Sequence, residues 1–169
     1  MTRARAAVVY NDARAVREAA AAAGARRVVL ANGCFDPLHV GHVRYLADAA
    51  NHGDFLVVAV NDDGGARRLK GPGRPVVPAV DRCALVAALR GVAAVLVFGD
   101  DTVEPILRAL HPAVHAKGTD YTRDTVPERE IAVELGIETV IAGDAKTHAS
   151  REIVGRVRTA SRDGGSGRE

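Results

Sequence analysis

Apolar runs alternate with segments of helical periodicity along most of this chain. Short runs of Val, Leu, Ile and Ala predict strands, whereas apolar residues that recur three and four positions apart predict helices. The predicted strands cover residues 28–32, 55–60, 94–98, 113–116 and 138–142. The predicted helices cover residues 12–23, 40–51, 80–90, 102–110, 127–135 and 150–158.

This alternation favours a parallel sheet, because each parallel crossover needs a connecting helix and returns with a right-handed turn. We therefore expect an α/β protein with a Rossmann-like, doubly wound, five-stranded parallel sheet and helices on both faces. Gly24, Gly91 and Gly136 follow helical stretches, as left-handed caps do, and Pro127 suits the first turn of a helix. Ligands of such sheets bind beyond the carboxyl ends of the strands.

Composition limits the size and the surroundings of the protein. Of the 169 residues, 47% are apolar, which suits one domain, expected over residues 1–160. The polar, glycine-rich residues 161–169 are expected to form a disordered tail. Cys34 and Cys83 are too few for a disulfide framework, and no apolar run predicts a signal peptide or a membrane span. We expect a cytoplasmic protein without a membrane partner.

The charges are nearly balanced. The chain has 23 basic and 21 acidic residues, for a net charge of +2. This balance does not suggest the broad basic face of a nucleic-acid-binding protein, so small anions are the expected partners.

Residues 33–42 (GCFDPLHVGH) carry the strongest chemical signal, because they join a predicted strand to a predicted helix. His39 and His42 are three positions apart and therefore share a helix face. Backbone N–H groups at a helix start attract an anion, and Gly41 lets a phosphate approach the backbone. The segment therefore predicts a phosphate site. A helix cap and a zinc pair are the alternatives, although the other histidines show no spacing that completes a zinc site.

The segment resembles the signature of the cytidylyltransferase-like nucleotidyltransferase superfamily, whose motif is H-x-G-H. The similarity continues through residues 53–63 (GDFLVVAVNDD), 68–71 (RLKG), 74–76 (RPV) and 117–121 (KGTDY). These segments resemble the D-glycero-β-D-manno-heptose 1-phosphate adenylyltransferases, which are often fused to a sugar kinase. The resemblance covers about residues 26–158. It implies transfer of AMP from ATP to a sugar 1-phosphate, with Mg²⁺ bound mainly through the phosphates, by a homodimer.

The resemblance also implies roles for individual residues. The expected catalytic residues are His39, His42 and Lys70. The expected nucleotide-binding residues are Asn32, Gly33, Cys34, Phe35, Gly41, Lys117, Thr147 and Ser150. The expected substrate-binding residues are Asp36, Arg68, Arg74, Arg90 and Asp120, and no protein ligand is assigned to the metal.

Simpler explanations stay open for several of these residues. Asp36 also suits a turn residue that bonds its own backbone before Pro37. Lys70, in a predicted long loop with other cations, suits either a phosphate-binding loop or a solvated surface loop. Arg90 also suits a cation at a helix C-terminus.

The same holds further along the chain. Lys117 and Asp120 also suit a surface turn, and Ser150 also suits an ordinary N-cap.

Residues 143–150 (GDAKTHAS) depart from the family pattern, in which adjacent serines and threonines precede an Ile-Ile pair. This departure leaves the choice between ATP and CTP open. Two alternatives therefore remain: a cytidylyltransferase acting on glycerol 3-phosphate or a similar phosphorylated alcohol, and a nucleotide-binding module without catalysis.

Overall fold

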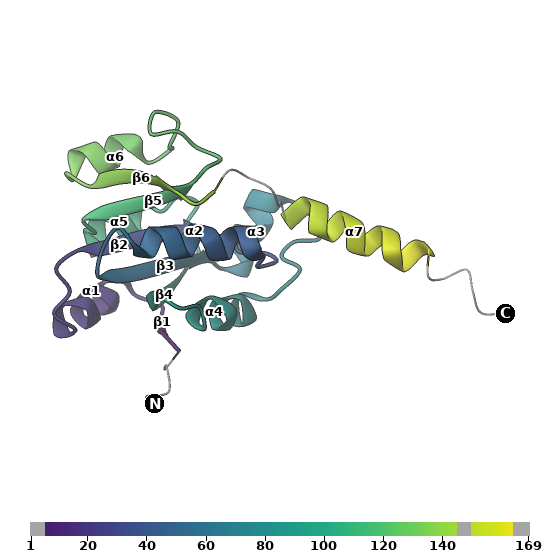
Figure 1. The fold of residues 1–169 in the computed structure, drawn as a ribbon, viewed down its shortest axis with the longest axis horizontal. Helices are drawn as coiled ribbons and strands as arrows, with labels where there is room; N and C mark the ends of the chain where they lie inside the picture. Colours follow the sequence, from purple (N-terminus) through teal and green to yellow (C-terminus); the bar gives the residue numbers. More distant parts are fainter. Residues whose placement is uncertain (1–5, 145–149, 164–169) are drawn as a thin grey trace.

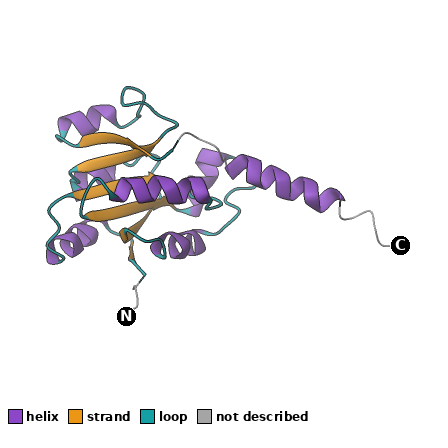
Figure 2. Ribbon diagram, in the orientation of Figure 1, coloured by secondary structure: helices purple, strands orange, loops and turns teal. Residues whose placement is uncertain are grey.

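A six-stranded parallel sheet forms the centre of the protein in the computed structural model, which describes residues 6–144 and 150–163 (Figures 1 and 2). Its strands are β1 (Val8–Tyr10), β2 (Val28–Gly33), β3 (Phe55–Asn61), β4 (Val92–Phe98), β5 (Val114–Gly118) and β6 (Glu138–Ala142). Their order across the sheet is β1-β4-β3-β2-β5-β6. The chain winds from β2 to β3 and β4 on one side, then crosses back to β5 and β6, which confirms the doubly wound Rossmann-like fold.

Helices cover both faces of this sheet. They are α1 (Ala13–Ala22), α2 (Val40–Ala50), α3 (Asp63–Lys70), α4 (Ala79–Ala87), α5 (Glu104–Leu110), α6 (Arg129–Glu134) and α7 (Ser150–Asp163). Helices α2 and α4 pack on one face, and α1, α5 and α6 pack on the other. Helix α7 extends away from the body, beyond the carboxyl end of the sheet (Figure 1). None of the helices in residues 6–144 and 150–163 is long and apolar enough to cross a lipid bilayer.

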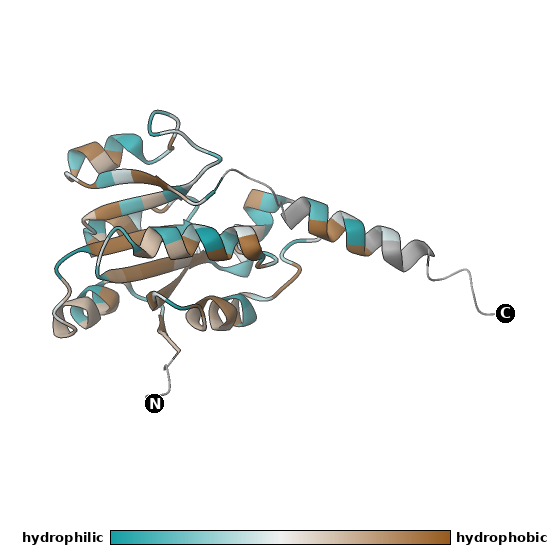
Figure 3. Ribbon diagram, viewed as in Figure 1, coloured by the Kyte–Doolittle hydropathy of each residue, from teal (hydrophilic) through white to brown (hydrophobic). Residues whose placement is uncertain are grey.

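Burial of both faces explains why the strands are apolar at consecutive positions rather than at alternate ones. In β3, Val58 and Val60 belong to the core under α2 and α4, whereas Val57 and Ala59 belong to the core under α1, α5 and α6. The hydropathy colouring shows β3 as a nearly continuous apolar strand (Figure 3). The two cores hold the sheet between its two layers of helices.

Two elements differ from the sequence prediction. The sheet has six strands instead of five, because Val8–Tyr10 pairs with Ala94–Leu96 at the sheet edge. Three residues are too few for a periodicity signal. The predicted loop around residue 70 is partly helical, since α3 spans Asp63–Lys70. The Asp62 side chain accepts a hydrogen bond from Gly65 N at 2.6 Å and caps this helix. The helix was not predicted because its two glycines have a low helix propensity.

The helix ends follow the expected signals only in part. Gly24, Gly91 and Gly136 have φ values of 73°, 90° and 67°, which confirms them in the left-handed conformation. The prediction for Pro127 is wrong, because α6 begins at Arg129 and the proline lies before its N-cap. Helix α7 continues to Asp163, so the expected tail does not begin at residue 161; residues 164–169 lie outside the described part.

Candidate active site

The motif segment lies at the carboxyl end of the sheet, at the point where the strand order reverses. Strand β2 leads through residues 34–39 into α2 on one face, while its neighbour β5 arrives from α5 on the other face. In an open parallel sheet, this reversal leaves a crevice between the two adjoining loops, and ligands bind there. The segments after β2 and β5 are therefore the two sides of the candidate site.

His39 and His42 are held together at the first turn of α2. His39 is the N-cap, and its Nδ1 accepts a hydrogen bond from Gly41 N at 3.1 Å. The two imidazole rings stack with 3.8 Å between centroids, and Phe35 meets His42 edge-on at 5.1 Å. Because Nδ1 of His39 is an acceptor, the proton of the neutral ring lies on Nε2. The helix-cap alternative is thus correct for His39, and the donor group of this ring is Nε2–H.

The side chains that directly follow β2 are buried in the protein. The side chains of Cys34 and Phe35 are buried, at 7% and 2% exposure, and Phe35 has a φ of 51°. That left-handed conformation is costly for a bulky residue and marks a turn that the surrounding packing enforces. A Cβ atom on Gly33 would lie 3.3 Å from the Phe35 ring. A bound nucleotide can therefore meet Cys34 and Phe35 only through their main chain.

Asp36 stabilises the structure of the site, and its carboxylate is not exposed to a ligand. Its side chain is fully buried and accepts hydrogen bonds from Val76 N and Val77 N at 2.9 Å. It also forms an ion pair with Arg74 Nε at 2.7 Å. The expected bond to its own backbone is absent from these contacts, and direct substrate binding by Asp36 is wrong because its carboxylate is enclosed. These contacts attach the segment before α4 to the motif segment.

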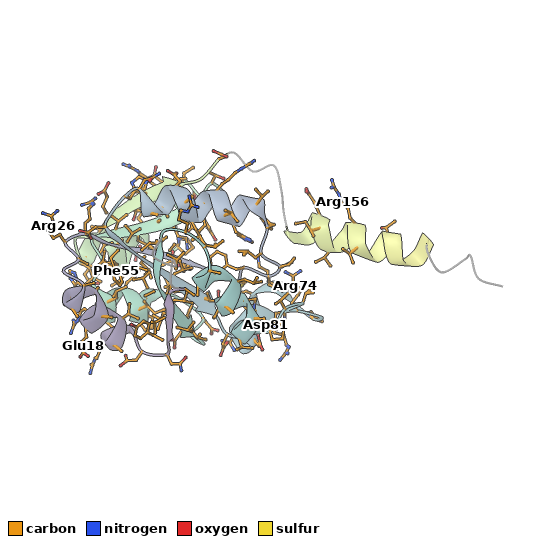
Figure 4. The ribbon with its side chains drawn as sticks, turned by 60° about the horizontal axis from the view of Figure 1, so that its bottom comes forward. Glu18, Arg26, Phe55, Arg74, Asp81 and Arg156 are labelled. Carbon is orange, nitrogen blue, oxygen red and sulfur yellow. The ribbon has the colours of Figure 1, made fainter. Side chains whose placement is uncertain are left out.

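Two of the expected substrate-binding arginines, Arg68 and Arg90, differ in their position relative to the site. Arg68 Nε is paired with Asp101 at 2.6 Å, and its Nη2 donates to the Gly99 carbonyl, so α3 turns it toward the loop after β4. Arg90 follows the end of α4 and precedes β4, which places it at the amino end of the sheet. The structure therefore contradicts the assignment of Arg90. Arg68 lies on the carboxyl side of the sheet in an exposed ion pair, so its role in substrate binding stays a prediction. Figure 4 shows this polarity, with Arg74 at the end from which α7 extends and Arg26, which precedes β2, at the opposite end.

Lys70 is brought to the motif by α3, of which it is the last residue. Its side chain is exposed, and its positive charge acts on the thiol of Cys34. Burial raises the pKa of Cys34, and the Lys70 charge is the largest effect in the opposite direction. The lysine is thus near the turn that carries the histidines, on an exposed helix end where its ammonium group can reach an anion.

Arg82, on α4, is a fully buried cation that sequence reasoning did not assign to the site. Its Nη1 donates to the carbonyls of Cys34 and Asn61, at 2.6 and 2.8 Å, and its Nη2 pairs with Asp63 at 2.9 Å. Its Nε donates to the carbonyl of Val77 at 2.8 Å. One side chain therefore joins the ends of β2 and β3 to the starts of α3 and α4.

Asn32 and Lys117 meet at the crevice, together with two residues that sequence reasoning missed. His115 Nε2 lies 3.1 Å and Lys117 Nζ 3.5 Å from Asn32 Oδ1. Lys117 Nζ is also paired with Glu128, at 3.1 Å from Oε2. The side chains of Lys117 and Glu128 are 7% and 10% exposed, so this is a buried ion pair rather than part of the surface turn considered above.

The remaining expected residues are Asp120, Ser150 and Thr147. Asp120 is exposed in the turn after β5, on the carboxyl side of the sheet. Ser150 is the first residue of α7, so it lies within the helix and not at its N-cap. Thr147 lies outside the described residues. Across residues 6–144 and 150–163, no group of three or more His, Cys, Asp and Glu side chains is arranged to hold a metal ion.

A histidine pair at a helix start, on the carboxyl edge of a doubly wound parallel sheet, defines a nucleotidyltransferase of the Rossmann-like class. A comparison with protein families supports this class: the model described as "Cytidylyltransferase-like" matches residues 30–160. The chain belongs to this family.

Curated relatives and a solved structure agree with the family. The bifunctional protein HldE of Alcanivorax borkumensis is 42% identical over 158 residues, which are 94% of this chain and 32% of that protein. HldE of Gluconacetobacter diazotrophicus is 44% identical over 134 residues, 79% of this chain and 28% of that protein. The chain thus spans about a third of the length of these relatives. The crystal structure of a lipopolysaccharide core biosynthesis protein from Thermoplasma volcanium has a TM-score of 0.61 and 26% identity, covering 71% of this chain and 98% of that one.

Proposed function

We propose that this chain transfers AMP from ATP to a sugar 1-phosphate, with D-glycero-β-D-manno-heptose 1-phosphate as the substrate. The geometry of the histidine pair supports the nucleotidyl transfer. The similarity of residues 117–121 and 68–71 to the heptose 1-phosphate adenylyltransferases, together with the HldE relatives, supports the substrate. ATP enters as its Mg²⁺ complex, in which the metal is carried by the phosphates, since Asp36, the carboxylate of the motif, is enclosed by its own partners.

The reaction forms one bond and breaks one. A phosphate oxygen of the sugar 1-phosphate attacks the α-phosphorus of ATP in line, and the bond from that phosphorus to the bridging oxygen breaks, so pyrophosphate leaves with the electron pair. The nucleophile is already an anion, and no general base is needed. Catalysis therefore depends on positioning the two phosphates and on stabilising the charge that develops on the oxygens around the α- and β-phosphorus.

The residues of the motif supply that stabilisation. Nε2–H of His39 donates to a phosphate oxygen, because its Nδ1 is held by Gly41 N. His42 stacks on it one helix turn further on and donates beside it, and the N–H groups of the first turn of α2 add partial positive charge. Lys70 neutralises part of the triphosphate charge from the end of α3.

The observation that carries the proposal is the hydrogen bond from Gly41 N to His39 Nδ1 within a stacked histidine pair at a strand-to-helix turn. The test is incubation with Mg–ATP and a panel of sugar 1-phosphates that includes the heptose, with products identified by mass. We expect an ADP-sugar and pyrophosphate from the heptose substrate alone. Tight ATP binding without product from any sugar would indicate a nucleotide-binding module and contradict the proposal.

The same panel decides between nucleotides. Incubation with Mg–CTP and glycerol 3-phosphate should give no CDP-glycerol, whereas a cytidylyltransferase of that type would form it. We further propose that the enzyme is a homodimer in the cytoplasm, where ATP is available. Light scattering of the purified protein should give twice the mass of 17.7 kDa expected for one chain, and a single-chain mass contradicts this part of the proposal.

A further inference from the structure

The buried polar group beside the crevice has an arrangement that determines which way the Asn32 carboxamide faces. An ammonium group can only donate, so the atom of Asn32 nearest Lys117 must be the oxygen Oδ1. His115 Nε2, which lies 3.1 Å from the same oxygen, must then carry the proton. Both contacts hold Oδ1 inside the protein. No hydrogen bond between described residues uses the NH₂ group of Asn32, at the end of β2.

His115 is suited to hold one protonation state. It is fully buried in β5, and burial, together with the charge of Lys117, lowers the pKa of His115 from 6.5 to about 3. The ring is therefore neutral near neutral pH, with its single proton on Nε2. Its Nδ1 is buried and has no hydrogen-bond partner among the described residues, so the Asn32 contact is the polar contact that this ring makes.

The group as a whole is electrically neutral. The charge of Lys117 is cancelled by Glu128, whose two oxygens lie 3.1 and 3.3 Å from Nζ. Glu128 is the N-cap residue of α6, yet its side chain makes no capping hydrogen bond, so its contact in this structure is the lysine. A neutral group of this kind offers no net attraction to a triphosphate, and it suits an uncharged polar part of a ligand.

We propose that His115 is a positioning residue of the nucleotide site, which orients Asn32 so that its NH₂ group donates to an uncharged acceptor on the base or ribose of ATP. This inference rests on the proposed function. Leu30, the residue of β2 that pairs with His115, is apolar and fully buried, and an apolar residue at 115 would avoid the cost of burying an imidazole. The histidine gains its value from the contact with Asn32. Because Asn32 and the His39–His42 pair flank the same strand end, one nucleotide can reach both.

Calorimetric titration separates this role from a structural one, with Mg–ATP and inorganic tripolyphosphate in Mg²⁺ as the two probes. His115→Leu should weaken ATP binding about tenfold, the effect of one hydrogen bond to a ligand, and leave tripolyphosphate binding unchanged. His115→Gln places an amide N–H near the position of Nε2 and should restore ATP binding to within about threefold of the unsubstituted protein. His115→Asn is too short to do so. His52→Leu, at the amino end of the sheet, is the control.

A double substitution tests the route through Asn32. If His115 acts by orienting that residue, Asn32→Ala with His115→Leu weakens ATP binding no more than Asn32→Ala alone. Unchanged ATP binding in His115→Leu, equal weakening of ATP and tripolyphosphate, or additive effects in the double variant would each overturn the inference. These titrations need no turnover. A protein that binds ATP but forms no nucleotide sugar would contradict the proposed reaction and leave the role of His115 decided by the titrations.

Discussion

His39 and His42 are held in different ways although they occupy the same turn. Nδ1 of His39 accepts a hydrogen bond from Gly41 N in α2, and this bond fixes the ring and its tautomer. His42 is oriented by its neighbours, between the His39 ring on one side and the edge contact with Phe35. The first residue is thus positioned by a hydrogen bond, and the second is positioned by packing against the first and against the core.

Removal of the second imidazole tests its role. His42→Ala should lower kcat for nucleotide-sugar formation by about a hundredfold or more, since one lost charge-stabilising donor costs about 3 kcal/mol. The circular dichroism spectrum should stay unchanged, because the ring is half-buried and caps no helix. His52→Ala, just beyond the other end of α2, is the control and should keep full activity. Activity near the unsubstituted level in His42→Ala would remove the histidine pair from the mechanism.

Arg82 and Arg108 show how burial changes the value of an arginine. Arg82 is fully buried and bonds three carbonyls and Asp63. Arg108 bonds Glu104 and Glu134 while its side chain is 47% exposed. Water replaces the partners of the exposed arginine at little cost, but it does not reach the carbonyls around the buried one.

Arg82→Ala should therefore lower the free energy of unfolding by at least about 3 kcal/mol, measured by urea denaturation. The matched control Arg108→Ala should lower it by no more than about 1 kcal/mol. Equal losses in the two variants would show that Arg82 does not hold the strand ends together.

At the scale of elements, close backbone contacts hold the turn between α2 and β3 against the neighbouring strand β2. The turn between α2 and β3 packs directly on the start of β2, where Asp54 N donates to the Arg27 carbonyl at 3.0 Å. A Cβ atom on Gly53 would collide with that carbonyl and lie 2.6 Å from Val29 Cγ2. The turn has no room for any side chain at this glycine.

Gly53→Ala should lower the free energy of unfolding by about 3 kcal/mol, because a rigid backbone atom must move to admit the methyl group. Gly24→Ala, in the turn between α1 and β2, is a matched control. Its φ is 73° with no atom within 4 Å of a new Cβ, so it should cost only about 1 kcal/mol of left-handed strain. Thermal unfolding of both variants gives the comparison, and a loss at residue 53 no larger than at residue 24 would contradict the steric explanation.

At the scale of the whole molecule, the buried neutral His115 couples stability to pH. Its pKa falls from 6.5 to about 3 on folding, so the unfolded chain binds a proton below pH 6.5 that the folded protein does not bind until about pH 3. The stability that this group contributes is present above pH 6.5 and is lost as the pH falls toward 3.

Between pH 7 and pH 5, this group should lower the free energy of unfolding by about 2 kcal/mol. His115→Gln cannot take up the proton, and it should lose about 2 kcal/mol less than the unsubstituted protein over the same range. Urea denaturation at the two pH values measures the difference. Parallel losses in the two proteins would mean that His115 is not held neutral.

Much of this organisation follows from local sequence. Strand β6 was predicted at its observed bounds, residues 138–142, and the other four predicted strands overlap the observed ones. The histidine motif was predicted at its strand-to-helix turn because the side chains that define it are close neighbours in sequence. Helix α3 and strand β1 could not be predicted, since one depends on the Asp62 cap and the other on pairing with β4.

The sequence by itself determined the alternation of strands and helices, the family, and the turn that carries His39 and His42, because periodicity and short motifs act over a few residues. Only the tertiary structure decided which charged side chains are paired with other residues inside the protein. Asp36 is enclosed by Arg74, and Lys117 is paired with Glu128 beside His115. These contacts depend on where strands and loops distant in sequence come together, and burial then determines whether a charged side chain can meet a ligand or must meet another residue.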